Sequence, residues 1–194
     1  QSYTTLNSRI ESTYVAESNA NNKNSVYDSY IKAFRWASDR INKKDGGIIG
    51  FVTNGAWLDG NAQDGFRKCL EREFSSIYVF NLRGNQRTSG ELSRKEGGKI
   101  FGSGSRTPIA ITILVKHPNK PTNEKAKIYY RDIGDYLSRE DKLRIIKEMG
   151  DINHPMMQWK EITPNEHGDW INHRNEMFRL FTPLGDKDDK KNKE

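Results

Sequence analysis

The chain has 194 residues, of which 34% are hydrophobic and 30% are charged, with a formal net charge of +6. This balance suits one domain with long polar loops or a piece of a larger protein, and it permits contact with nucleic acid. A single cysteine, Cys69, excludes an internal disulfide framework and fits a cytoplasmic protein. The sequence contains no apolar run long enough to span a membrane and no metal-ligand spacing, so we expect neither a membrane contact nor a metal site.

The first part of the chain is polar and leads into one amphipathic helix. Residues 1–24 are rich in Ser and Asn, which predicts a polar loop with one short helix near residues 10–15. A helix is predicted from Ser25 to about Asn42, with Ser25 and Asp28 as a capping pair. Its apolar positions recur at helical spacing: Tyr27, Tyr30, Phe34, Ala37 and Ile41. So regular a stripe indicates core packing rather than ligand contact.

Three apolar segments predict β-strands at residues 47–54, 76–82 and 109–116. A second amphipathic helix, marked by Phe66 and Phe74, lies between the first two. Strands that alternate with helices predict an α/β fold with parallel βαβ units, so the sheet is expected to be mostly parallel. The third strand has no helix before it, and we therefore expect it to insert antiparallel to its neighbours.

The pattern changes after residue 118, where a mixed α/β extension is predicted over residues 119–183. It contains a strand at residues 126–133 and a helix that is capped by Ser138 and Asp141 and ends at Gly150. Residues 184–194 are charge-rich, which predicts a disordered tail or linker.

A glycine-rich loop, "GGKIFGSGSRTP" at residues 97–108, precedes the third strand. A phosphate cradle is disfavoured because the loop leads into a strand and not a helix. A solvated surface loop and the wall of a substrate pocket both remain open. Phe101, Arg106 and the surrounding charge favour the pocket wall, because a cationic loop with one aromatic suits a nucleic-acid backbone beside a stacked base. Residues 83–106 carry a net +4 from Arg83, Arg87, Glu91, Arg94, Lys95, Glu96, Lys99 and Arg106.

Residues 25–118 resemble the carboxyl half of the catalytic domain of amino (adenine-N6) DNA methyltransferases. The similarity is to the type I single-polypeptide restriction-modification enzymes, in which nuclease, helicase-like, methyltransferase and target-recognition parts are fused. It rests on "SVYDSYIKAFRWASDRI", on "GGIIGFVTNGAWLDGNAQDGFRKCLEREFSSIYVFNLRGNQRTSGELSRKEGGKIFGSGSRTPIAITILVK" and on "GDWINHRNEMFRLFTPLGDK". The resemblance implies a partial Rossmann-like methyltransferase sheet with one antiparallel hairpin strand, in a bacterial cytoplasmic protein.

The resemblance also implies roles for individual residues. Phe101, Arg106 and Asn54 would line the pocket of an extruded target adenine, with Phe101 against one face of the base. The helix that carries Tyr27, Asp28 and Tyr30 would lie on the side of the S-adenosylmethionine site. The DNA backbone would be contacted by basic residues of the loop: Arg83, Arg87, Arg94, Lys95 and Lys99.

Two family motifs do not occur in this sequence. The Pro-Pro-Tyr motif that carries methyl transfer is missing, and so is the glycine-rich turn that binds the cofactor. We therefore expect no catalytic residue and no bound S-adenosylmethionine in this chain, and no activity of the chain by itself. Its expected partners are DNA, the upstream half of the methyltransferase domain and the fused helicase and nuclease domains. An uncovered apolar edge on the first strand further predicts self-association or partial disorder of residues 1–24.

Two other hypotheses stay in view. The chain could be a stand-alone nucleic-acid-binding or assembly module with a methyltransferase-like fold, and a Pro-Pro-Tyr motif encoded just upstream would decide against that. A hydrolase that uses Asp59, Asp64 or His117 has little support, because these residues have no suitably spaced partners.

Overall fold

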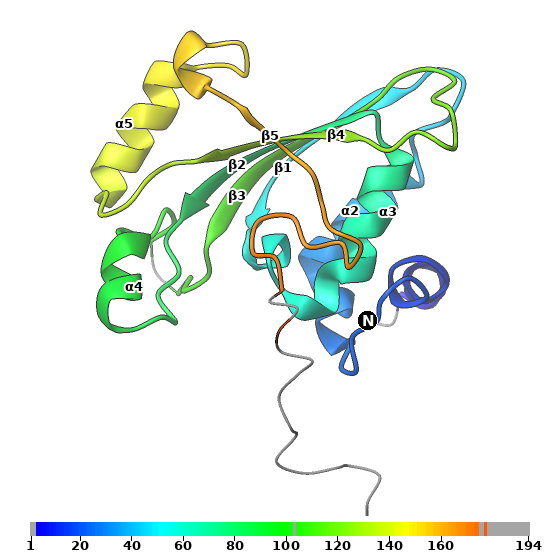
Figure 1. The fold of residues 1–194 in the computed structure, drawn as a ribbon, viewed down its shortest axis with the longest axis horizontal. Helices are drawn as coiled ribbons and strands as arrows, with labels where there is room; N and C mark the ends of the chain where they lie inside the picture. Colours follow the sequence, from blue (N-terminus) through cyan, green and yellow to red (C-terminus); the bar gives the residue numbers. More distant parts are fainter. Residues whose placement is uncertain (1–2, 103, 175–176, 178–194) are drawn as a thin grey trace, which may run out of the picture.

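A five-stranded mixed sheet runs through the computed structural model, which describes residues 3–102, 104–174 and 177 (Figure 1). The spatial order of the strands is β1-β3-β2-β4-β5. The strands are β1 (Gly47–Asn54), β2 (Ser76–Arg83), β3 (Ile109–Lys116), β4 (Lys127–Asp132) and β5 (Lys160–Ile162). The α/β class and the positions of the first four strands agree with the sequence analysis. The predicted tail at residues 184–194 lies outside the described residues.

The third strand lies between the first two. β3 pairs antiparallel with both β1 and β2, with Ile48 opposite Val115 and Ile77 opposite Leu114, so the predicted antiparallel insertion is confirmed. The expectation of a mostly parallel sheet is wrong, because most neighbouring strands pair antiparallel. Only the β2–β4 pair is parallel, because β3 separates β1 from β2 and β5 runs antiparallel to β4. Alternating elements in a sequence give strand directions, but they do not say which strands are neighbours.

Helices on one face of the sheet come from the first half of the chain. They are α1 (Thr4–Ile10), the π-helical turn η1 (Glu11–Val15), α2 (Ser29–Ser38) and α3 (Asp64–Glu73), with short 3₁₀ turns at Asn24–Tyr27, Ala56–Leu58 and Asn61–Gln63. Residues 4–15 are thus helical throughout, where a loop with one short helix was expected. The predicted Ser25–Asp28 cap is also wrong. The 3₁₀ turn occupies residues 24–27, and α2 then starts at Ser29 with no side-chain cap.

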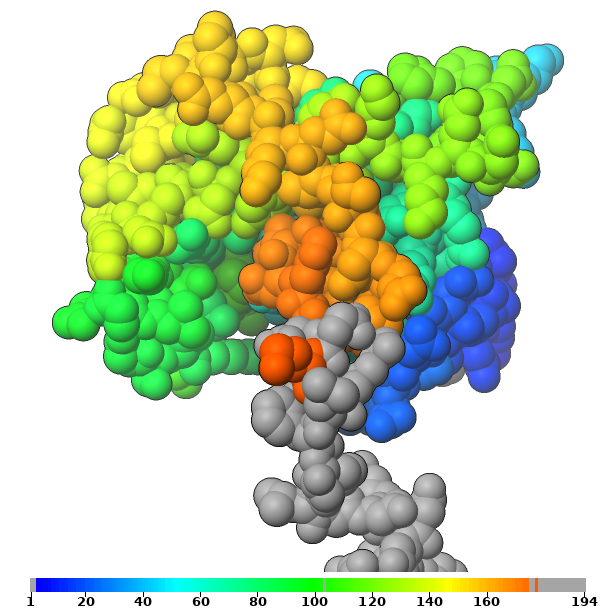
Figure 2. Space-filling view, viewed as in Figure 1, coloured from blue at the N-terminus to red at the C-terminus, as the bar shows by residue number. Residues whose placement is uncertain are grey.

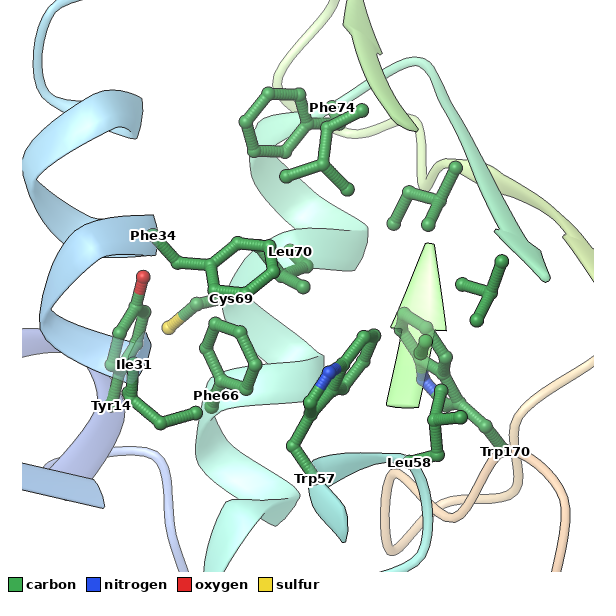
Figure 3. Close-up of a cluster of buried hydrophobic side chains, with 14 of the residues drawn as sticks. Tyr14, Ile31, Phe34, Trp57, Leu58, Phe66, Cys69, Leu70, Phe74 and Trp170 are labelled. Carbon is green, nitrogen blue, oxygen red and sulfur yellow. The ribbon is translucent and has the colours of Figure 1, made fainter. Parts of the chain in front are cut away.

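The main core lies between these helices and the sheet, and aromatic side chains dominate it (Figure 3). Phe34 packs edge-to-face on Phe66 with 5.2 Å between ring centroids, and Trp57 packs on Phe66 at 5.3 Å. Trp57 also packs on Trp170 at 5.4 Å, which brings the end of the described chain into this core. Such pairs each contribute roughly 0.5–1.5 kcal/mol beyond the area that they bury. The predicted stripe of α2 is therefore a core stripe.

A smaller core lies on the opposite face of the sheet, beneath α5 (Arg139–Met149). Phe80, Leu82 and Ile109 of the sheet pack there with Met149. The predicted cap of α5 is confirmed: Ser138 and Asp141 form a reciprocal capping box, and Gly150 ends the helix. A further 3₁₀ turn, η5, spans Pro155–Met157.

β1 is an edge strand whose two faces differ. Ile49 is buried under the helices, whereas Ile48 and Val52 on the other face are 71% and 53% exposed. In the part of the chain that the structure describes, β1 is thus an edge strand that exposes apolar side chains on one face.

The segment of residues 165–174, drawn in orange, crosses the front of the molecule between the α4–α5 side and the blue helices (Figure 2). The fully buried Arg67 of α3 holds this segment by donating from Nε to the carbonyl of Gly168 over 2.7 Å. Its Nη1 also donates to the carbonyls of Trp57 and Gly60, so one guanidinium links this segment to the turn after β1. Burial lowers the pKa of Arg67, and Asp169 opposes that effect.

Within the described residues, no helix is both long and apolar enough to cross a lipid bilayer. The same residues contain no group of three or more side chains that could hold a metal ion.

Candidate nucleic-acid interface

The residues between β2 and β3 form a cation-rich excursion, residues 84–108, which we name the basic loop. It contains a helix, α4 (Gly90–Glu96), where the sequence analysis expected an irregular segment. Basic residues in the last turn of α4 and Gly97 directly after it, at φ 67°, are the signals that could have revealed this helix. Figure 1 shows α4 on the same side of the molecule as α5, away from α2 and α3.

Phe101 is presented by the basic loop and is not a core residue. Its side chain is 49% exposed, whereas the preceding Ile100 is 6% exposed and packs in the smaller core. Ile100 therefore anchors the chain, and the next residue projects into solvent. Phe101 therefore does not fill the core, and its aromatic ring is accessible.

Arg106 closes the base of the loop. Its Nη2 donates to the carbonyl of Gln86 over 3.0 Å, and the amide of Gln86 donates back to the carbonyl of Arg106 over 3.0 Å. The two legs of the loop are thus joined while the Arg106 side chain remains at the surface.

The predicted backbone-contacting cations fall into two groups. The Arg83 guanidinium is engaged by Asp132 at 2.8 Å and by Asp135, so two carboxylates already neutralise it. Burial alone would lower the pKa of Arg83, but these hydrogen bonds outweigh burial and raise it. Arg87 and Arg94 are exposed, and Lys95 and Lys99 are partly exposed; Arg94 pairs with Glu91 on its own helix. The second group is the one available to an anion.

Asn54 ends β1 and shapes the following turn. Its Oδ1 accepts a hydrogen bond from the amide of Ala56 over 2.9 Å, as in a side-chain-stabilised turn. A cavity of about 100 Å³ lies beside this turn, with walls from Gly55, Asp59, Asn85 and Glu96. The turn after β1 and the basic loop after β2 therefore meet at one cavity, although neither Asn54 nor Phe101 is part of its lining.

Sequence reasoning missed two cations from α5 that hold the basic loop. Lys142 is fully buried, and its Nζ donates to the carbonyls of Glu96 and Gly98 over 2.7 and 2.8 Å. Arg139 donates from Nε to the carbonyl of Ile100 over 2.9 Å. Burial lowers the pKa of Lys142 to about 8, with Glu96 opposing the change. No pattern in the sequence marks a helical lysine as buried.

The residues predicted on the cofactor side of α2 do not form a site by themselves. Tyr27 and Tyr30 pack against the main core, and burial raises the pKa of Tyr30. Asp28 is exposed at the start of the helix, and its side chain makes no capping bond. These three residues do not enclose a ligand, so they do not fit S-adenosylmethionine without further protein.

The chain is thus an α/β unit with an exposed aromatic on a braced cationic loop. No protein-family model matches it, and no curated protein matches it. Solved structures do. One is a nuclease-deletion mutant of the Type ISP restriction-modification enzyme LlaGI in complex with a DNA substrate mimic. Its sequence is 49% identical to this chain over 96% of this chain's length, and the TM-score is 0.84. The ATP-dependent Type ISP restriction-modification enzyme LlaBIII bound to DNA is 42% identical over 97%, with a TM-score of 0.88.

A third similar structure, the DrdV–DNA complex, is 32% identical over 91% of this chain, with a TM-score of 0.80. The match covers 14%, 12% and 16% of the LlaGI, LlaBIII and DrdV chains, respectively, so this chain corresponds to a small part of each. This chain is homologous to a part of the Type ISP restriction-modification enzymes, and its fold is consistent with their methyltransferase region.

Proposed function

We propose that this chain is the carboxyl half of an S-adenosylmethionine-dependent DNA adenine-N6 methyltransferase domain in a restriction-modification enzyme. The observation that carries the proposal is the exposed Phe101 on a cationic loop, in a chain 49% and 42% identical to enzymes solved with a DNA mimic or with DNA. The sheet would be part of a Rossmann-like methyltransferase sheet in a cytoplasmic protein. The small share of each relative that is matched favours this proposal over a stand-alone binding module.

The proposed role of the basic loop is to receive the target base and the DNA backbone. An enzyme that modifies a base inside a duplex must rotate it out of the stack, at a cost of a few kcal/mol. Stacking of the base on Phe101 returns about 1–3 kcal/mol of that cost. Arg87, Arg94, Lys95 and Lys99 would hold neighbouring phosphates.

Asn54 and Arg106 have supporting roles in this proposal. Asn54 would fix the turn that borders the small cavity, because its Oδ1 accepts from the Ala56 amide. Arg106 would keep the legs of the loop together beneath Phe101.

The remaining parts of the methyl-transfer site would come from elsewhere in the complete protein. The cofactor supplies the methyl group when it is bound, and Tyr27, Asp28 and Tyr30 would lie near it only as part of a larger wall. The isolated chain should therefore transfer no methyl group to DNA and bind S-adenosylmethionine weakly or not at all. Methyl transfer by the isolated chain above background, in a radiolabel assay, would contradict this assignment.

The test of the proposed function is substitution of Phe101 in the complete enzyme. Phe101→Ala should slow methylation of duplex DNA while leaving the melting temperature unchanged, because the side chain is half exposed. Phe101→Trp should retain much of the rate. The loss should be smaller when the target adenine is mismatched, since such a base leaves the stack more easily. Leu92→Ala, at an exposed apolar position on α4, is the matched control. An unchanged rate for Phe101→Ala would reject the role in base stacking.

A further inference from the structure

The segment that carries Phe101 is held by hydrogen bonds to three of its backbone carbonyls, those of every second residue from 96 to 100. Lys142 Nζ holds those of Glu96 and Gly98, and Arg139 Nε holds that of Ile100. Arg139 and Lys142 are three residues apart, so they lie on one side of α5. One turn of one helix therefore fixes the chain up to the peptide bond that joins Ile100 to Phe101.

Backbone contacts also hold this segment against the start of α5. The amide of Gly98 donates to the carbonyl of Leu137 over 2.9 Å, just before α5 begins. A Cβ at Gly97 would lie 2.2 Å from the Leu137 carbonyl oxygen, and one at Gly98 would lie 2.3 Å from the Arg139 nitrogen. Real Cβ atoms do not approach backbone so closely, so both glycines are required for the segment to lie against the start of α5.

These hydrogen bonds hold the segment more firmly than expected for an exposed loop. Hydrogen bonds from a charged donor are about twice as strong as neutral ones, and the two to Lys142 are shielded from water because its side chain is fully buried. Ile100 adds an apolar anchor in the smaller core. Phe101 thus projects from a fixed base rather than from a slack loop.

We infer that Arg139 and Lys142 are positioning residues, which set the place and direction of Phe101 for the extruded base from the first turns of α5. The inference rests on the proposed function, since it assigns to this part of the extension a task at the target base. Neither residue contacts the base itself. They act through the carbonyls of residues 96, 98 and 100.

The experiment uses the complete enzyme with Arg139→Ala. This change removes the hydrogen bond to Ile100 and a 3.9 Å ion pair with the exposed Glu140, and it should leave the fold intact because the Arg139 side chain is half exposed. Arg144→Ala is the control. It lies on the same helix and removes the same charge, but its partners are Asp141 and Glu148 and not the loop. Arg139→Lys should restore part of the effect, because it keeps a cationic donor.

Two readouts are measured. Hydrogen exchange of peptides covering residues 97–102 should accelerate in Arg139→Ala and not in Arg144→Ala. The kcat/KM for methylation of duplex DNA should fall about tenfold, the size expected for one charge-assisted hydrogen bond, and fall less on a mismatched target adenine. Lys142→Met should give the same pattern more strongly, with its melting temperature recorded alongside.

The outcomes distinguish failure of the positioning role from failure of the proposed function. Unchanged exchange in Arg139→Ala, or faster exchange with unchanged kcat/KM, overturns the positioning inference. A wild-type enzyme that methylates no DNA overturns the proposed function instead, and the exchange readout then decides by itself whether Arg139 holds the segment.

Discussion

Trp170 donates a hydrogen bond from its indole Nε1 to Oε1 of Glu71 over 2.9 Å, and both side chains are buried. The two residues are 99 positions apart in the sequence. Together with Arg67 and Gly168, this bond fixes the end of the described chain against α3. The contact joins the region of residues 25–118 to the later part of the described chain, so the two form one packed structure.

Breaking this bond should destabilise the chain. Trp170→Phe leaves a buried carboxylate oxygen of Glu71 without its donor, which costs about 1–3 kcal/mol, in addition to lost packing on Trp57. Urea unfolding measures the change. Trp36→Phe, at a side chain that is 51% exposed, should cost far less. Equal losses for the two variants would show that the Glu71 bond contributes nothing.

Because of Lys142, the free energy of unfolding should increase with pH in the alkaline range. Its pKa is about 8 in the folded chain, against an ordinary value of 10.5. Between these values the unfolded chain binds the proton and the folded chain does not, so stability rises with pH through this window. From pH 7.5 to 9 the gain should be about 1 kcal/mol, as measured by urea unfolding.

The pH range from 7.5 to 9 also distinguishes the effect of Lys142 from that of other titratable groups. Burial raises the pKa of Cys69 from 9.0 to about 11, so this thiol lowers stability as pH rises, and it does so mainly above pH 9. Lys142→Met should remove the rise between pH 7.5 and 9, and Lys147→Met on the exposed side of α5 should keep it. A rise that survives in Lys142→Met would assign it to another group.

DNA binding should depend on salt through the exposed cations of the basic loop. Each phosphate contact contributes about −0.9 to the slope of log affinity against log salt on duplex DNA. Replacing Arg87, Arg94 and Lys99 with Ala should therefore flatten the slope by up to three such contributions. Fluorescence anisotropy at several salt concentrations is the measurement.

Arg83→Ala serves as the contrasting variant. Because Asp132 and Asp135 already engage this guanidinium, its loss should lower the melting temperature and leave the salt slope nearly unchanged. A large change in slope for Arg83→Ala would return this residue to the DNA-contacting group.

The isolated chain should self-associate through β1. This edge strand exposes Ile48 and Val52 together, and such edges pair readily with one another. The double variant Ile48→Lys, Val52→Lys should be monomeric at concentrations where the original chain forms larger species in sedimentation velocity. Leu92→Lys, at another exposed apolar residue, should not prevent association. Monomeric behaviour of the unaltered chain would contradict the prediction.

The sequence by itself determined the elements with strong local signals. The strands at 47–54, 76–82 and 109–116, the α3 helix and the capped α5 helix follow from periodicity, β-branched content and the Ser138–Asp141 pair, which act between near neighbours. It also placed an aromatic and several cations on one loop. It misjudged residues 4–15, the cap of α2 and α4, because short polar helices carry few apolar positions and therefore weak local patterns.

Only the tertiary structure decided which strands are neighbours and which cations are free. β3 lies between β1 and β2 and pairs with both, which is a property of the assembled sheet. Arg83 and Arg87 look alike in the sequence, yet Asp132 and Asp135, about fifty residues onward, engage only Arg83. Lys142 likewise reads as a surface residue of α5, and it is buried because the carbonyls of Glu96 and Gly98 replace its water. Contacts between distant segments set the burial and pairing of a charge, and no local pattern records them.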